Sequence, residues 1–303
     1  MTTFETPDQT DDYAELSARY DQLPEVEMPD GVGDGSMQVG LSSVPGKLKG
    51  LLEQTGEIGR FSWEAIRTIP KVRLYPTEVF RQTALLILGS GLIIWLMVFV
   101  MGLECGTEAS YILKQFGAPL YSGIFDAYCD LRECIVYMWG YIVSAKVGCG
   151  LVAEIGSMRI SEEIDVLEVM GIRPMSFVVA TRVVGYLIAV PFLYAVGLGV
   201  IFAGSYFATI IQLKTVSPGG FLSVYWLFQN PLDILFSFTK LFAETVVIIL
   251  VGCYYGYTSR GGSVGVGRNT AKSMIVNLIM VHIIGVTGTL LFWGQNPRAP
   301  IGN

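Results

Sequence analysis

Residues 84–103 read ALLILGSGLIIWLMVFVMGL, a run without any charged side chain. As an α-helix that rises about 1.5 Å per residue, this run would extend about 30 Å, the thickness of the hydrocarbon core of a bilayer. Four later stretches are nearly as apolar. We therefore predict an all-α integral membrane protein with five transmembrane helices. The expected spans are about 84–103, 134–152, 176–200, 236–258 and 273–293.

The composition agrees with this prediction. Of the 303 residues, 52% are hydrophobic and 15% are charged, which is typical of integral membrane proteins. One apolar region, 176–213, is too long for a single straight helix and contains Pro191. We expect a span up to about residue 200, followed by a kink or by a second, interfacial piece along the outer surface.

The N-terminal part of the chain is predicted to lie outside the membrane core. Residues 1–35 contain ten acidic residues and one basic residue, so residues 1–40 are predicted to be a disordered acidic tail. Basic and apolar residues alternate over 41–80, which indicates an amphipathic helix in the plane of the cytoplasmic interface or, alternatively, a soluble linker helix. Residues 81–296 then form the membrane domain, and 297–303 form an external tail.

Basic residues set the expected orientation. With five spans and a cytoplasmic N-terminus, 15 of the 20 Lys and Arg residues fall on the cytoplasmic side or in segments that face it, as the positive-inside rule requires. The expected location is the plasma (inner) membrane, multi-pass, with the C-terminus external. Segments 153–174 and 258–272 are then cytoplasmic.

Residues 153–174, AEIGSMRISEEIDVLEVMGIRP, lie between two spans and have the pattern of a short, acidic, amphipathic helix. Ser161 is a candidate N-cap, Gly171 allows a left-handed stop, and Pro174 prevents continuation. One apolar row contains Ile160, Ile164, Leu167 and Met170. Such a row must be buried, either beneath the spans of the same chain or against a cytoplasmic partner. We favour the partner.

Segment 258–272, TSRGGSVGVGRNTAK, has glycines at 262 and 267, the spacing of a phosphate-binding loop. However, Arg268 and Asn269 stand where that loop requires Lys and Ser or Thr, and no strand is expected before it. We predict that the chain has no ATPase site and is not an enzyme. The segment is expected to be a tight connection between the last two spans.

Ionisable residues within spans are costly in lipid and usually face a partner or a wet cavity. Lys240 and Glu244 are four residues apart and could pair on one helix face. Structural pairing and a substrate pathway are both compatible with these groups. His282 is expected to be a packed, hydrogen-bonded residue. The candidates for lining a lipid pathway are Trp95, Met97, Glu104, Lys240 and Glu244.

The five cysteines have no CxxC or metal-ligand spacing, and we predict neither a metal site nor catalytic residues. In the expected topology Cys105, Cys129 and Cys134 all lie toward the outer face. A disulfide among them is therefore an open alternative to three small, buried or interfacial thiols.

Three segments together point to a family. Residues 153–174 and 254–275, the latter reading YYGYTSRGGSVGVGRNTAKSMI, resemble the two signature segments of MlaE/YrbE-type permeases, the membrane subunits of ABC lipid transporters. Residues 132–156, RECIVYMWGYIVSAKVGCGLVAEIG, resemble the second span of that family. The resemblance covers about 47–293 and is greatest to the YrbE B subunits of mycobacterial Mce (mammalian cell entry) systems.

This resemblance implies a coupling helix that sits on a separate cytoplasmic ABC ATPase dimer. ATP and Mg would be used by that ATPase, and this chain would bind no cofactor. The implied coupling residues are Glu154, Gly156, Met158, Arg159, Glu162, Glu163, Asp165, Leu167 and Met170. A paralogous permease subunit would complete a heterodimer around the lipid path. MCE-domain proteins would shuttle hydrophobic lipids such as fatty acids across the envelope, with no nucleic acid involved.

The sequence also departs from the family pattern. The family usually has Gly-Pro after Arg132-Glu133, where this chain has Cys134-Ile135. This change indicates a specialised half of a heterodimer. The alternative function is a non-transporting membrane scaffold that recruits a cytoplasmic partner through residues 153–170.

Overall fold

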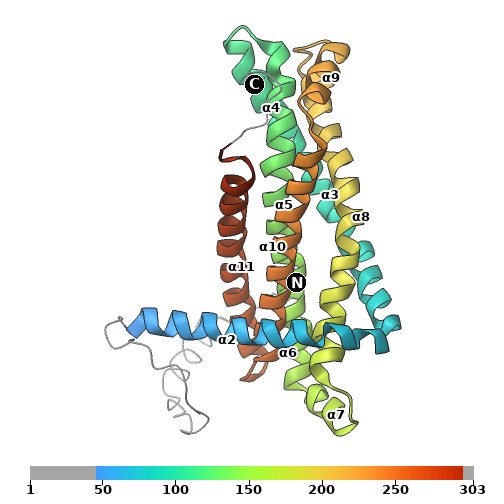
Figure 1. Cartoon of the computed structure of the whole chain (residues 1–303), viewed down its shortest axis with the longest axis vertical. Helices are drawn as coiled ribbons and strands as arrows, with labels where there is room; N and C mark the ends of the chain where they lie inside the picture. The colour runs from blue at the N-terminus through green and yellow to red at the C-terminus, as the bar shows by residue number, and fades with distance from the viewer. Residues whose placement is uncertain (1–45, 296–303) are drawn as a thin grey trace, which may run out of the picture. The chain divides into compact units, whose positions relative to one another are not determined.

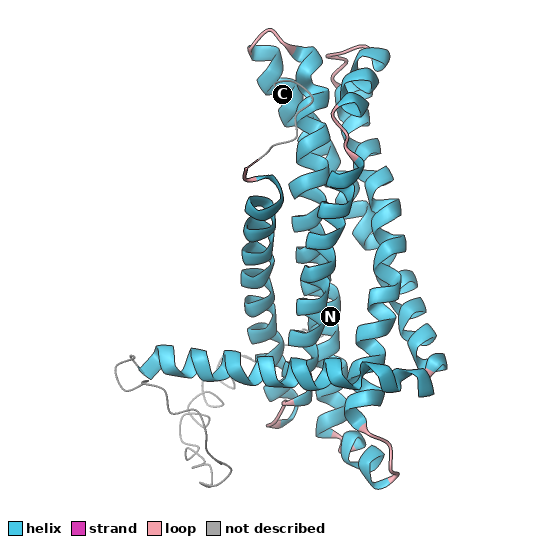
Figure 2. Cartoon of the chain, in the orientation of Figure 1, coloured by secondary structure: helices cyan, strands magenta, loops and turns pink. Residues whose placement is uncertain are grey.

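The computed structural model describes residues 46–295, and for residues 46–52 it gives the helical backbone alone. The predicted tails 1–40 and 297–303 lie outside the described residues. Residues 46–295 form helices joined by short loops, with no strand among them (Figure 2). Five of these helices are long and apolar enough to cross a bilayer. The predicted fold class, an all-α protein with five spans, is therefore confirmed.

The five long helices follow one another along the chain, and two of them are interrupted by π-helical turns. The first is α3, Pro76–Gln115, and the second covers Pro119–Ile160. This second helix contains α4 (Ser122–Cys129), the π-helical η4 (Asp130–Cys134), α5 (Ile135–Val143), the π-helical η5 (Ser144–Gly148) and α6 (Cys149–Ile160). The third contains α8 (Thr181–Tyr206) between the π-helical η6 (Met175–Ala180) and η7 (Phe207–Gln212). The last two are α10 (Pro231–Tyr257) and α11 (Gly262–Trp293).

Every long helix extends beyond the span predicted for it at one end or both. The first has 40 residues, about 60 Å at ~1.5 Å per residue, which is twice the thickness of the hydrocarbon core. The third helix does not end near residue 200: it continues through Pro191 as far as Gln212, so the alternative of a separate interfacial piece is wrong. Beyond residue 200, the extended part of the third helix packs closely against α3.

The packing of α3 against α8 depends on glycine. A Cβ atom added at Gly102 would collide with the carbonyl oxygen of Ile201, and one added at Gly106 would lie 2.7 Å from the carbonyl oxygen of Ser205. On the opposite side of the contact, a Cβ atom at Gly204 would collide with the carbonyl oxygen of Phe99. Gly102 and Gly106 form a G-x-x-x-G pair, the spacing that lets membrane helices approach closely.

Before the first span lies α2, Gly46–Thr68, followed by a short 3₁₀ helix, η2, Ile69–Leu74. From residue 51 onward α2 runs across the long helices near the end where α7 (Glu163–Val169) lies (Figure 1). Its Phe61 ring packs edge-on against Tyr254 of α10, with centroids 5.7 Å apart, while Trp63 and Ile66 are exposed. The helix expected in 41–80 is present, and its position at a membrane surface stays a prediction.

The core is formed mainly by the second, third and fourth long helices, and α3 contributes Ile94 and Val98 to it. Trp139 of α5, Leu193 of α8 and Ile248 of α10 are completely or almost completely buried in one cluster. In contrast, α11 is mostly exposed, with a row of apolar side chains that includes Ile279, Ile283 and Leu290. Figure 1 shows α7 at one end of these helices, with α4 and α9 (Pro218–Leu227) at the other end.

Candidate functional site

The segment predicted to be one coupling helix, 153–174, is divided in two. Its first part is the end of α6, and after a break at Ser161 and Glu162 the seven-residue α7 follows. Ser161 is not the N-cap: its hydroxyl donates to the Ser157 carbonyl (2.9 Å) and contacts the Glu163 carboxylate (3.0 Å). Glu162 itself has φ 61°, a left-handed conformation that is unfavourable for residues other than glycine. This turn ends α6, so α6 and α7 are two separate helices.

The end of α7 agrees better with the prediction. Gly171 is left-handed, with φ 78°, and Pro174 precedes the next long helix. Of the predicted apolar row, Ile164 is buried and Leu167 is half-buried against the chain's own core. The row therefore packs partly beneath its own spans, which was the alternative interpretation.

A second apolar surface of α7 remains exposed. It consists of Val166, Val169 and Met170, and Val169 is 89% exposed. These residues are spaced i, i+3, i+4 and therefore lie on one side of the helix. Val166 and Val169 were not predicted as site residues, although their spacing in the sequence is the signal that could have found them. We refer to these three side chains as the α7 patch.

An ion pair joins α7 to α6 across the break. Arg159 of α6 lies 2.6 Å from Asp165 of α7, and its guanidinium lies 5.9 Å from the ring centroid of Tyr257, the last residue of α10. The predicted coupling residues Arg159 and Asp165 therefore form an ion pair with each other. They hold the short helix in a defined place beneath α10.

A second ion pair joins α6 to α8. The buried guanidinium of Arg182 donates to the carboxylate of Glu154 (2.6 Å) and to the carbonyl of Val178 (2.6 Å), and it lies 3.9 Å from the sulfur of Met158. Glu154 is half-exposed while Arg182 is 4% exposed. Arg182 was not predicted as a site residue. It connects two predicted coupling residues to the third long helix.

The two segments that resemble family signatures lie side by side. A Cβ atom at Gly156 would be 2.9 Å from a methyl of Val266 and 3.1 Å from the hydroxyl of Ser259. The predicted loop 258–272 is mostly helix, because α11 begins at Gly262 and leaves four connecting residues. From α11, the Asn269 amide donates to the hydroxyl of Ser259 in this connection (3.2 Å). The glycines are used for a tight turn and close helix packing.

Beside α7 the surface is hollowed. A hollow of about 460 Å³ lies between the end of α2 and the segment after α7. Its lining includes both signs of charge, from Glu64, Lys71, Glu168 and Arg173. This hollow and the α7 patch together offer an exposed, shaped surface at one end of the long helices.

A polar network lies between η4, α10 and α11, toward the opposite end. Lys240 of α10 donates to the Arg132 carbonyl (2.8 Å), to Glu133 (3.2 Å) and to the Thr289 hydroxyl (2.7 Å). The predicted pairing of Lys240 with Glu244 is wrong. The ammonium reaches partners on two neighbouring helices, while Glu244 is fully buried and forms no hydrogen bond within the described residues.

The structure does not bring the five lipid-pathway candidates together. Lys240 and Glu244 lie inside the packed helices on α10, whereas Trp95, Met97 and Glu104 lie on α3. The Trp95 indole donates to the Leu193 carbonyl of α8 (3.2 Å), and Met97 and Glu104 are exposed. α3 packs mainly against α8, on a different side of the molecule from the polar network.

His282 lies near the polar network on α11. Its ring accepts or donates hydrogen bonds with the Tyr141 hydroxyl (3.0 Å) and the Leu278 carbonyl (2.8 Å). The hydrogen bonds agree with the prediction, but the side chain is exposed rather than packed inside.

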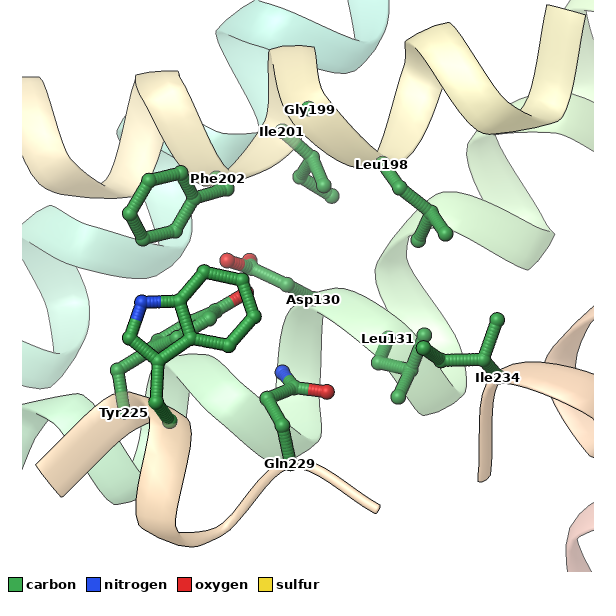
Figure 3. A pocket seen from close by; sticks show the side chains of 10 residues that line it. Asp130, Leu131, Leu198, Gly199, Ile201, Phe202, Tyr225, Gln229 and Ile234 are labelled. Atoms are coloured by element: carbon green, nitrogen blue, oxygen red, sulfur yellow. The ribbon is translucent and has the colours of Figure 1, made fainter. Parts of the chain in front are cut away.

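A cavity that was not predicted lies between η4, α8 and α9. It has a volume of about 150 Å³. Figure 3 shows Asp130 and Gln229 reaching into a space whose other walls are apolar or aromatic, among them Phe202, Tyr225 and Ile234. The cavity lies at the end of the helices away from α7.

A family model described as Permease MlaE matches residues 79–291, more than two thirds of the chain. The chain belongs to the MlaE permease family. The match includes both signature segments and the packed spans between them, so the resemblance to MlaE-type permeases is confirmed.

Named relatives support the same assignment. A probable ABC transporter permease protein of Rickettsia prowazekii is 27% identical over 241 residues, which cover 80% of this chain and 93% of the relative. The intermembrane phospholipid transport system permease protein MlaE of Haemophilus influenzae is 26% identical over 243 residues, which cover 78% and 91%. The chloroplastic protein TRIGALACTOSYLDIACYLGLYCEROL 1 of Arabidopsis thaliana is 26% identical over 156 residues, which cover 50% and 43%. With its five apolar helices, this MlaE-family chain is a multi-pass membrane protein of the ABC permease type.

Proposed function

We propose that this chain is the transmembrane permease subunit of an ABC-type lipid transporter. Its work is driven by a separate cytoplasmic ATPase dimer that uses ATP and Mg, and the chain contributes no nucleotide site of its own. It pairs with a paralogous permease subunit and carries hydrophobic lipids, such as fatty acids, across the plasma (inner) membrane together with MCE-domain proteins. Family membership and the relatives named as ABC and phospholipid permeases support this proposal.

One observation carries the coupling role. The α7 patch is apolar and exposed at the end of the long helices, and it is bordered by the acidic side chains of Glu162, Glu163 and Glu168. Exposed apolar side chains with a polar rim are typical of protein interaction sites. In this proposal the ATPase covers the patch. The ion pair of Asp165 with Arg159 transmits its movement to α6.

The lipid's polar headgroup is proposed to bind near the network of Lys240. Glu133 of that network is 33% exposed while Lys240 is 1% exposed, so the network is accessible from the Glu133 side. An ionic pair that is open on one side can exchange its internal partner for a charged headgroup. Apolar side chains exposed on α11 would accommodate the acyl chains in this proposal. Mass spectrometry of the lipid that copurifies with the complex would identify the class of lipid.

The coupling role is tested by charge reversal. The triple variant Glu162→Lys, Glu163→Lys, Asp165→Lys is expected to lose copurification with the ATPase and to lose lipid uptake by cells, with the permease still present in the membrane. The matched control is Glu108→Lys. Glu108 is an exposed acidic residue near the C-terminal end of α3, and its reversal should leave both readouts unchanged. Intact ATPase recruitment and uptake in the triple variant would show that the coupling role is wrong.

The alternative is a non-transporting scaffold that recruits a cytoplasmic partner through 153–170. A scaffold predicts that the triple variant loses the partner while lipid uptake by the remaining components continues. It also predicts that the purified complex holds no lipid of defined class. Labelling of residues 161–170 from the outer side of the membrane would contradict both functions, since both require a cytoplasmic α7.

A further inference from the structure

Three cysteine side chains meet at one point near the end of the helices away from α7. The sulfur of Cys134 lies 3.0 Å from that of Cys105 and 3.1 Å from that of Cys129, and the sulfurs of Cys105 and Cys129 are 3.5 Å apart. Cys105 and Cys134 are buried, and Cys129 is half-buried. In the part of the chain that the structure describes, this is the one group of metal-binding side chains whose ligand atoms converge.

The chain forms this cluster through a local change of helix geometry. Cys129 and Cys134 are five residues apart, which would place them about 140° apart around an α-helix. They are instead joined by the π-helical η4, in which residues i and i+5 follow one another along the same side. Cys105 reaches them from α3, next to the close glycine contacts of that helix with α8. Two helices are therefore shaped so that three thiols converge.

The three separations favour one shared ligand over a disulfide. A disulfide bond is about 2.05 Å long and joins two sulfurs, whereas here all three pairs lie at similar, longer separations. Three sulfurs so spaced can each lie about 2.3 Å from a single ion, the length of a zinc–thiolate bond. Thiolates are soft ligands that select Cu⁺, Zn²⁺ and iron–sulfur clusters.

Two buried carboxyl groups lie beside the cluster. Asp130 follows Cys129 directly and Asp126 lies one helical turn before it, and both are completely buried. Among the described residues, the two side-chain oxygens of Asp126 have no hydrogen-bond partner. One side-chain oxygen of Asp130 accepts from the Ser205 hydroxyl, and the other has no partner. Buried polar atoms without partners are rare and require an explanation. A nearby cation would lower the free energy of such a site.

We propose that Cys105, Cys129 and Cys134 bind one soft metal cation, with Cu⁺ preferred over Zn²⁺. Structural zinc sites almost always have four ligands, and three converge here, a number that suits Cu⁺. Each thiol that binds as a thiolate releases its proton to solvent. The cation would enter the site past Cys129, the half-buried member of the cluster. The bound ion would tie α3 to η4, so it would fix the ends of the first two spans to each other.

The test uses the full chain, coexpressed with its partner permease and purified in reductant. The protein is equilibrated with Cu⁺, generated from copper(II) by ascorbate, or with Zn²⁺ alone, and unbound metal is removed by gel filtration. We expect one copper per chain by elemental mass spectrometry, near-ultraviolet absorption from copper–thiolate charge transfer, and a higher unfolding temperature. Each of Cys105→Ser, Cys129→Ser and Cys134→Ser should reduce bound copper at least tenfold.

Matched controls are Cys149→Ser and Cys253→Ser, because these two cysteines lie outside the cluster, and each should retain one copper. Gel-filtration profiles identify any variant that fails to fold, and Cys129→Ser, at the half-buried position, is the least disruptive of the three. Copper below a tenth of an equivalent in the wild-type chain would overturn the proposal. A second sample is purified without reductant: if two thiols per chain then react with maleimide after denaturation only when reductant is added, the cysteines form a disulfide and the proposal is overturned. Zinc bound at one equivalent in place of copper would overturn the three-coordinate assignment.

Discussion

The charged residue Arg132 is stabilised in an apolar core by one ion pair and two cation–π contacts. Its guanidinium pairs with Asp233 at 2.7 Å and lies over the rings of Tyr128 (3.9 Å) and Trp293 (5.0 Å). The Trp293 indole donates to the second oxygen of Asp233 (2.9 Å). One buried cation therefore joins the second long helix to both α10 and α11.

Removing this cation should destabilise the chain strongly. In Arg132→Ala the carboxylate of Asp233 stays buried without its ionic partner, which typically costs about 3–5 kcal/mol. The measurement is thermal or denaturant unfolding of the purified chain in detergent. The control is Arg81→Ala, which breaks an ion pair with Glu78 in which the Arg81 side chain is 62% exposed, and it should cost about 1 kcal/mol or less. Equal losses in the two variants would contradict the buried role of Arg132.

At the scale of elements, glycine spacing and π-helical turns decide which helices meet. Two backbone carbonyls of the π-helical η4 accept from α10: Leu131 accepts from the Ser237 hydroxyl (2.6 Å), and Arg132 accepts from Lys240 (2.8 Å). Lys240 therefore pairs with η4 rather than with Glu244 on its own helix.

The glycine contact of α3 with α8 gives a prediction for whole elements. Gly102→Leu inserts a side chain where a Cβ atom already collides with the Ile201 backbone. Overpacking of a closed contact typically costs about 1–3 kcal/mol, and α3 should move away from α8. Cross-linking of cysteines placed at facing positions on the two helices measures the separation. Gly89→Leu is the control, because a Cβ atom at Gly89 meets no atom within 4 Å, and it should leave the cross-linking yield unchanged.

At the scale of the whole molecule, the α7 end and the spans are joined by few polar links. Arg182 is the link to the third long helix through Glu154 and Val178. In the proposed transporter, movement of α6 and α7 reaches α8 through this arginine, as a sliding of packed helices between two arrangements.

Arg182→Met is therefore expected to separate recruitment from transport. The side chain keeps much of its volume but loses both hydrogen bonds, so the ATPase should still copurify while lipid uptake falls at least fivefold. Lysine at position 182 retains the charge and should restore part of the uptake. If uptake in Arg182→Met equals that of the wild type, with the same amount of permease in the membrane, the link does not carry the movement.

The sequence by itself determined that the chain is helical, crosses a membrane five times and belongs to a permease family. Apolar runs of sufficient length have no other stable form in lipid, where each backbone group must be paired within its own helix. The stop at Gly171 was equally predictable, since a left-handed turn is a property of one residue. The acidic and apolar side chains around α7 could be proposed for the same reason, as their periodicity is local.

Only the tertiary structure decided how the helices use their polar residues. Glu162 turns the chain and divides the predicted coupling helix, Lys240 pairs with neighbours instead of Glu244, and Arg182 becomes the link between two helices. The three cysteines converge because η4 changes the helical repeat, and no spacing rule for α-helices predicts that contact. Each of these outcomes depends on partners from distant parts of the chain, whose positions are set by close helix packing and not by local sequence pattern.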